Sequence, residues 1–233
     1  MNLLTYMKHL AGSGAIAYYY ATQIRDPKTR PDFLAGFQLV ESSTVPFLTV
    51  LSARAAAEGD TWLAEKLAKH ALEETIHAKI FDQAIKPLKK SLLNPQIIPT
   101  NTNESQSKQG RTPFSLYFEG YSSEQIQPEV IDWDVFMGST YILELDASKD
   151  FMRMANVLPD GDPTTRSLKL GILSIAKDET RHAAYLYEAM TRRMPATKVQ
   201  KLVDKWRTHK VNALLASVGD IMQSYSEKLF TVE

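Results

Sequence analysis

Apolar residues recur every three or four positions along four long stretches of the chain, and this spacing predicts four amphipathic helices. The stretches cover residues 31–58, 60–87, 132–157 and 164–193. Turn-forming segments at 58–60 and 158–163 join the members of each pair, so we expect two antiparallel helical hairpins. A fifth amphipathic stretch, 197–229, predicts a C-terminal helix that covers the bundle or forms a homodimer surface. The predicted fold class is therefore all-α.

Glycine and proline residues set the other expected boundaries. Residues 2–25 predict one or two short helices interrupted at Gly12-Ser13-Gly14. Pro46 should kink the first long helix, and Pro87 should close the second, because proline lacks the backbone N–H that continues a helix.

A long crossover, residues 92–130, separates the two hairpins. Its first part, 92–113, is polar and rich in turn formers, and we expect a mobile loop there. Its second part, 114–128, contains four aromatic residues and predicts a short helix packed across the bundle.

Six polar residues stand at positions where the apolar spacing calls for core residues. They are Glu41, Glu74, His77, Glu144, Glu179 and His182. A buried carboxylate without a partner neutralises itself rather than remain charged, so four carboxylates that converge with two imidazoles call for cations. Glu74 follows Glu41 by 33 residues and Glu179 follows Glu144 by 35, which places each pair at one height in its hairpin. The pattern predicts a dinuclear metal site in a four-helix bundle.

Composition narrows the chemistry. The chain of 233 residues has no cysteine, which excludes disulfides, zinc–thiolate sites, iron–sulfur clusters and cysteine nucleophiles. Its 27 basic residues balance its 27 acidic residues, so no global field favours nucleic acid. The N-terminus lacks the features of a signal peptide, and no window approaches 18 consecutive apolar residues. We expect one domain over residues 1–233, cytoplasmic and without a membrane span.

The residues around Glu179 and His182 resemble the motif of a known family. Glu144 followed by Asp178-Glu179-Thr180-Arg181-His182 is similar to the E…D-E-x-R-H signature of the ferritin-like di-iron carboxylate proteins. The first half, Glu41 and then Glu73-Glu74-Thr75-Ile76-His77, is a looser match, and the resemblance covers residues 31–193.

The resemblance implies a ferritin-like bundle whose six polar residues hold two iron ions, with a manganese–iron pair as the alternative. It also implies that Asp178 and Glu73 each accept a hydrogen bond from the histidine of the opposite Glu-x-x-His helix, and that Arg181 offsets the buried acid. The alternative interpretation of Glu73 is a solvated helix residue.

Other aromatic and histidine residues are interpreted as follows. Tyr141 and Tyr185 lie one turn from a ligand and either line the site or are redox-active, with packing favoured. His70, one turn before Glu74, could reach the metal, but a hydrogen bond to a neighbour is favoured. His9 and His209 stand apart from any cluster, and Trp62, Trp133 and Trp206 are expected in the core or an interface.

Histidine and carboxylate ligands suit iron, and a reduced di-iron pair can pass two electrons to dioxygen. We expect an oxygenase or oxidase that acts on a small or acyl-type organic substrate. Because no flavin, nicotinamide or iron–sulfur motif is present, the electrons should come from an external reductase or ferredoxin. The alternatives are a ferritin- or rubrerythrin-like ferroxidase or peroxidase, and a metal-binding bundle without turnover.

Overall fold

The structure is a computed structural model that describes residues 3–92 and 113–230. These residues form seven helices and no strand. The helices are α1 (Leu3–Arg25), α2 (Arg30–Ala57), α3 (Thr61–Leu92), α4 (Pro113–Tyr117), α5 (Trp133–Val157), α6 (Pro163–Arg193) and α7 (Ala196–Phe230). The all-α prediction is confirmed for this part of the chain.

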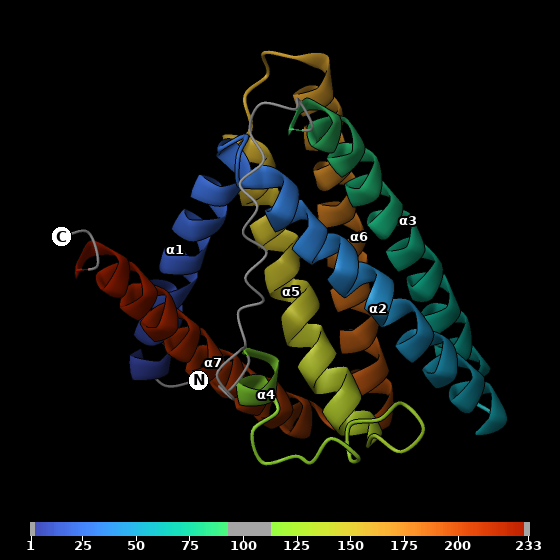
Figure 1. Cartoon of the computed structure of the whole chain (residues 1–233). Coiled ribbons are helices and arrows are strands. Elements are labelled where there is room, and N and C mark those ends of the chain that lie inside the picture. The colour runs from blue at the N-terminus through green and yellow to red at the C-terminus, as the bar shows by residue number, and fades with distance from the viewer. Residues whose placement is uncertain (1–2, 93–112, 231–233) are drawn as a thin grey trace.

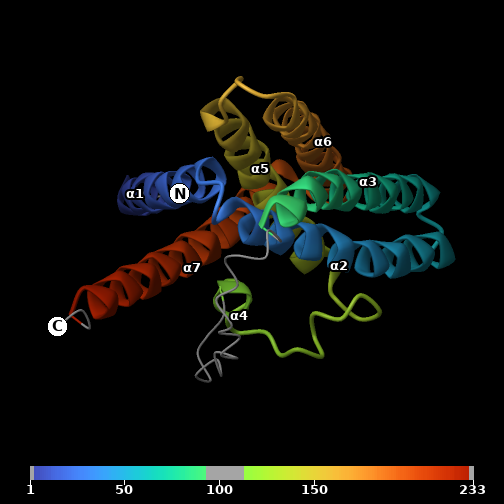
Figure 2. The ribbon, with the colours of Figure 1, turned by 45° about the horizontal axis from the view of Figure 1, so that its top comes forward.

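The helices pack as pairs. Extensive contacts join α2 to α3 and α5 to α6, and α3 packs against α6, so the two hairpins lie side by side (Figure 1). In contrast, the backbones of α2 and α5 stay further apart, and the two helices meet through aromatic side chains such as Phe37 and Phe151. α7 packs against α1, α4 and α5, and in Figure 2 α1 and α7 extend together on the side away from α3.

Short polar signals begin the central helices. Asp132 precedes α5 in an extended conformation, and its carboxylate accepts hydrogen bonds from the backbone N–H groups of Asp134 and Val135. Asp162 does the same for Thr165 at the start of α6. Each cap satisfies N–H groups that have no partner within the helix, and so fixes where the helix begins.

Specific residues also fix the connections between α1, α2 and α3. Gly59 turns the chain between α2 and α3 with φ 85°, a left-handed conformation that glycine adopts without steric cost. Arg30 is buried at the start of α2, where its guanidinium donates to the carbonyl oxygens of Ile24 and Arg25 at the end of α1. These carbonyls have no partner within α1, and the arginine also complements the negative helix end.

Two predicted helix breaks are wrong. The Gly12-Ser13-Gly14 segment lies inside the continuous α1, and α3 continues past Pro87 to Leu92. A glycine within a helix costs only about 1 kcal/mol relative to alanine. In α3, Ile85 is buried and Leu88 packs against the core, so tertiary contacts on both sides of Pro87 offset the missing hydrogen bond. The predicted loop at 92–113 falls almost entirely outside the described residues.

Around the site, the core consists of two apolar clusters with a polar layer between them, and a third cluster around Trp206 joins α5 to α4 and α7. Leu34 of α2 and Phe151 of α5 belong to one cluster, whereas Leu48 of α2 and Met137 of α5 belong to the other. Each glutamate of the polar layer on these helices lies seven residues, or two turns, from an apolar core residue on either side. Apolar core residues thus lie above and below the polar layer along the bundle axis.

Among the described residues, α2 is the one helix long and apolar enough to cross a membrane, by length and composition alone. Within the bundle, the same helix carries the buried carboxylate of Glu41 near its middle. A carboxylate at that depth is costly in a bilayer, so the composition of α2 is also explained by its place beside the polar layer.

Candidate metal centre

The structure brings all six sequence-predicted residues into one buried cluster and adds His70 to it. Their side chains come from α2, α3, α5 and α6, and none of the seven residues is more than 9% exposed. They form two groups that could each hold a metal ion, and the candidate ligand atoms of each group lie within 4.8 Å of one another. The first group is Glu41, Glu74, His77 and Glu179, and the second is His70, Glu74, Glu144 and His182. Because Glu74 belongs to both groups, its carboxylate lies where the two groups meet.

The imidazole of His77 is held from outside and points inward. Its Nε2 lies 3.2 Å from a carboxylate oxygen of Asp178, on the opposite hairpin. Its Nδ1 faces the cluster, 3.3 Å from Glu179 and 3.6 Å from Glu74, in ion-pair range but without a hydrogen bond. An outer carboxylate that fixes a ring in this way is the usual support of a metal-binding histidine.

His182 repeats the arrangement from the other hairpin. Its Nε2 lies 2.9 Å from Glu73, and its Nδ1 faces Glu179 at 3.1 Å and Glu144 at 3.8 Å. The Arg181 guanidinium donates to both outer acids, at 2.8 Å to Glu73 and in a closer contact to Asp178. The contacts predicted for these three residues are confirmed, and Glu73 is not a free solvated side chain. Arg181 thus ties the supports of the two histidines together.

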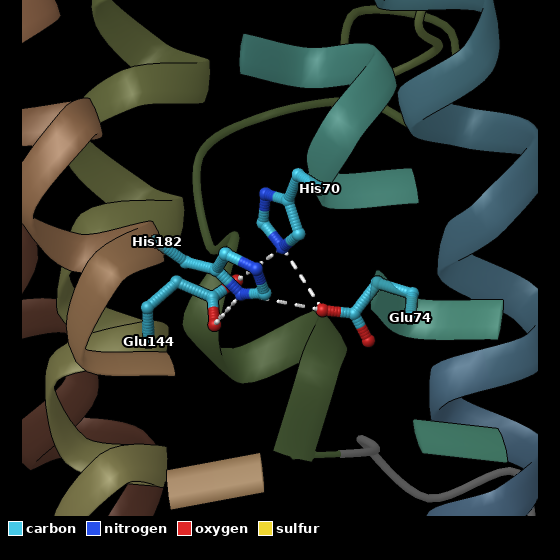
Figure 3. Close-up of side chains that lie close together, drawn as sticks. All are labelled: His70, Glu74, Glu144 and His182. Carbon is cyan, nitrogen blue, oxygen red and sulfur yellow. Dashed lines mark hydrogen bonds and ion pairs between the residues drawn. The ribbon is translucent and has the colours of Figure 1, made fainter. Parts of the chain in front are cut away.

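His70 is the member that the sequence interpretation underrated. Its Nδ1 lies 2.8 Å from the hydroxyl of Tyr185, and its Nε2 lies 2.9 Å from Glu74 and 3.5 Å from Glu144. Its ring stacks on that of His182, with centroids 3.6 Å apart. Figure 3 shows the two side chains close together, His70 from α3 and His182 from α6. The predicted hydrogen bond to a neighbour is present, yet the inner nitrogen also faces the cluster. The spacing of His70, Glu74 and His77 by four and three residues was the signal that one helix face carries three ligands.

Protons balance part of the negative charge when no cation is bound. Burial raises the pKa of Glu41 well above its usual value, and a hydrogen bond with Glu74 adds to the effect. Burial also raises the pKa of Glu144 well above its usual value, together with the charge of Glu179. Glu74, the partner of Glu41, and Glu179, the partner of Glu144, keep their negative charges. Hydrogen bonds hold the pKa of both below the ordinary value despite burial.

The histidines complete this balance. Burial lowers the pKa of His77, but the carboxylates of Glu179 and Glu74 outweigh it and raise the pKa to about 10. In the same way Glu144 and Glu179 raise the pKa of His182 to about 11 against its burial. Burial lowers the pKa of His70, which is therefore neutral. The cluster is a strongly cation-seeking environment in which protons occupy ligand atoms.

The donor set fits a pair of transition-metal ions. Four carboxylates and three imidazoles supply only oxygen and nitrogen, which suits iron or manganese. The Nδ1 atom of His77 supports this fit: it is buried, makes no hydrogen bond within the described residues, and faces three carboxylates at ion-pair distances. A buried polar atom without a partner is costly, and a cation between that nitrogen and the carboxylates would satisfy all of them at once.

A cavity of about 430 Å³ lies beside the cluster, between α2 and α5. All four cluster glutamates line it, and the rest of its wall is mainly apolar, including Phe37, Phe47, Phe136 and Phe151. Phe114 and Phe118, at or beside α4, line its outer side. The volume falls in the range of pockets that hold small organic molecules.

The remaining candidates have structural contacts. Tyr185 is buried and holds His70, whereas the half-buried Tyr141 packs against Tyr187 with ring centroids 5.5 Å apart. His209 lies against the fully buried Trp206, outside the cluster. His9 bonds Ser13 within α1.

The supporting residues thus extend the candidate site well beyond the six ligands of the motif. Compared with protein-family models, curated proteins and solved structures, the chain matches none of them. The chain is an all-helical protein with two buried histidine–glutamate groups that could hold metal ions.

Proposed function

We propose that the chain is a non-haem di-iron oxygenase or oxidase of the ferritin-like type that uses dioxygen to oxidise an organic substrate. The observation that carries the proposal is the apolar cavity, because it meets the carboxylates of both metal-capable groups. A metal pair buried without such a cavity would have no place for an organic molecule.

Each residue of the cluster has a role in this proposal. Glu41, His77 and Glu179 would hold one iron, and His70, Glu144 and His182 the other, with Glu74 between them. Two divalent ions balance the four glutamate charges, so the loaded cluster would be close to neutral. When bound, the iron pair supplies the two electrons with which dioxygen is activated. Asp178, Glu73 and Tyr185 hold the three imidazoles in place.

The cavity wall would keep water away from the reaction. Aromatic side chains pack at both ends of the polar layer, with Phe37 against Phe81 and Phe151 at one end and Phe47 against Phe136 at the other. Exclusion of water protects reactive species from side reactions and strengthens electrostatic interactions in the site.

The proposed reaction needs a source of electrons. The chain has no cysteine and no nucleotide-binding motif, so the electrons would come from a separate reductase or ferredoxin, unless the substrate supplies them. We place this activity in the cytoplasm.

Three alternative functions remain distinct from this one. A ferroxidase that stores iron, or a peroxidase of the rubrerythrin type, would use the same ligands, as would a metal-binding bundle without turnover. An apolar cavity beside the carboxylates favours an organic substrate over an iron-entry path, which needs acidic residues along its length.

Repeated additions of ferrous iron in air separate these functions. The proposal predicts one oxidation event, stoichiometric with the bound iron pair, after which further ferrous iron is oxidised no faster than in buffer. Oxidation and retention of many iron equivalents would instead indicate storage. Iron binding without any reaction with dioxygen would indicate a non-catalytic bundle.

A further inference from the structure

One basic side chain, Lys210 of α7, lines the apolar cavity. It is the only basic residue among the described residues of the cavity wall. Its position is set by its neighbour one turn earlier, since Arg207 is buried and binds Asp146 of α5 at 2.5 Å. Lys210 is therefore held beside the stretch of α5 that runs from Asp146 to Asp150.

The Lys210 ammonium group has no counterion at contact distance. Within residues 3–92 and 113–230, no carboxylate with a described side chain lies within 4.0 Å of Nζ. Asp146 is paired with Arg207, and Asp150 is paired with Arg153 at 2.8 Å. Nζ also lies 5.9 Å from the centroid of the Tyr117 ring.

Lys210 is also partly buried. Burial lowers its pKa, and the charges of Asp146 and Asp150 raise it only in part. An ammonium group partly removed from water and without a paired anion costs free energy, unless a bound anion completes its environment. Two divalent ions would neutralise the four glutamates, and the cavity-lining Asp150 is paired with Arg153, so Lys210 would be the cavity-lining charge without a partner at contact distance.

The geometry favours a ligand that is both elongated and amphipathic. On α5 the cavity wall extends from Phe136 to Met154, which corresponds to roughly 27 Å along the helix axis. A volume of about 430 Å³ spread along such a wall is a narrow space. Lys210 lies beside the Asp146–Asp150 stretch of α5. Along the helix axis, every residue of this stretch is at most roughly 9 Å from Glu144.

We propose that the cavity takes an amphipathic organic anion, whose carboxylate pairs with Lys210 and whose apolar body lies along the aromatic wall beside Glu144. The assignment of this molecule as substrate rests on the proposed function. The binding of this molecule does not depend on the proposed function, because the lysine and the cavity wall belong to the chain itself.

Three probes with one chain and different head groups test the proposal: octanoate, octanol and octylamine. Their binding is measured by calorimetry, without oxygen, to protein loaded with ferrous iron. Octanoate should bind most tightly. Lys210→Met should weaken octanoate at least about tenfold, the lower end of what a hydrogen bond to a charged group contributes, and leave octanol unchanged. Lys210→Arg should restore most of the octanoate affinity.

Two controls keep the result interpretable. Ala147→Leu, which narrows the cavity beside the cluster, should weaken octanoate and octanol alike. Circular dichroism and thermal melting verify that each variant folds. Equal octanoate affinity in the wild type and Lys210→Met overturns the proposal. Loss of octanoate binding on iron removal, with no effect of Lys210→Met, overturns it in favour of a direct bond to the metal.

The proposed function is tested by separate readouts, namely the iron content and the reaction with dioxygen of the same samples. Protein that binds octanoate through Lys210 but holds no iron would contradict the function and keep the anion site. Protein that holds and oxidises its iron, but whose octanoate affinity is unchanged by Lys210→Met, would contradict the anion site and keep the proposed function.

Discussion

Removal of the Asp178 carboxylate tests whether the histidines are positioned as metal ligands. In Asp178→Ala, His77 loses the acceptor that lies 3.2 Å from its Nε2, while every candidate ligand stays in place. The His77 ring is fully buried, so water does not readily replace the lost partner. The ring becomes free to turn or to carry its proton on the nitrogen that should face the metal.

The expected magnitude follows from this geometry. Loss of a carboxylate that supports a metal-binding histidine typically lowers metal affinity by about 10- to 100-fold, or about 1.4 to 2.7 kcal/mol. Only one of the two groups contains His77, so only one of two binding steps should weaken. Glu73→Ala should weaken the other step, because Glu73 supports His182. Both variants should still reach full occupancy at high metal concentration.

The assay is an anaerobic titration with ferrous iron against a competing chelator. Asp82→Ala is the matched control, since Asp82 forms only an exposed pair with Lys86 one turn away on α3. Asp178→Asn should fall between the wild type and alanine, because its amide oxygen can still accept a hydrogen bond from His77. Unchanged binding steps in a folded Asp178→Ala protein, or an equal loss in Asp82→Ala, would refute the reasoning.

Three further predictions concern ligands, packing and pH. His70→Leu should weaken the binding step of the group that contains Glu144, as measured by the same titration; lower thermal stability with unchanged iron binding would reduce His70 to a packing role. Gly138→Ala should destabilise the fold by about 1 to 3 kcal/mol in chemical denaturation, because a Cβ there would lie 2.5 Å from Trp206 Cδ1; wild-type stability would show that α7 can shift. Because the fold raises the pKa of His77 and of His182, protonation of these histidines stabilises the metal-free fold. This stabilisation is complete below pH 6.5, about the pKa of an unfolded histidine, and is lost as pH rises through about 10 and 11. Thermal melts should therefore show metal-free protein losing stability as pH rises and iron-loaded protein losing less; parallel curves would count against proton displacement by the metal.

Much of the site could be predicted because it depends on helix periodicity. A carboxylate in the middle of an apolar stripe, as at Glu41 and Glu144, identifies both the helix face and the layer at which it lies. The outer supports Glu73 and Asp178 were predicted from the resemblance to the ferritin-like signature and not from periodicity, and the structure shows both contacts. These contacts follow from two equal hairpins packed side by side.

Other features depend on three-dimensional packing and carry no local signal. Pro87 continues a helix because contacts elsewhere on α3 offset one missing hydrogen bond, and a sequence window does not show those contacts. The cavity arises because α2 and α5 stay apart, and Lys210 enters it from α7, more than sixty residues after Glu144. His70 was visible in the sequence, but its stacking on His182 was not.

The most direct test of the central claim is the iron content of protein reconstituted without oxygen and freed of loosely bound metal. The account predicts about two irons per chain, and loss of both in a folded variant that carries Glu144→Ala and Glu179→Ala together. A chain that binds no iron, or a double variant that binds as much as the wild type, would contradict it.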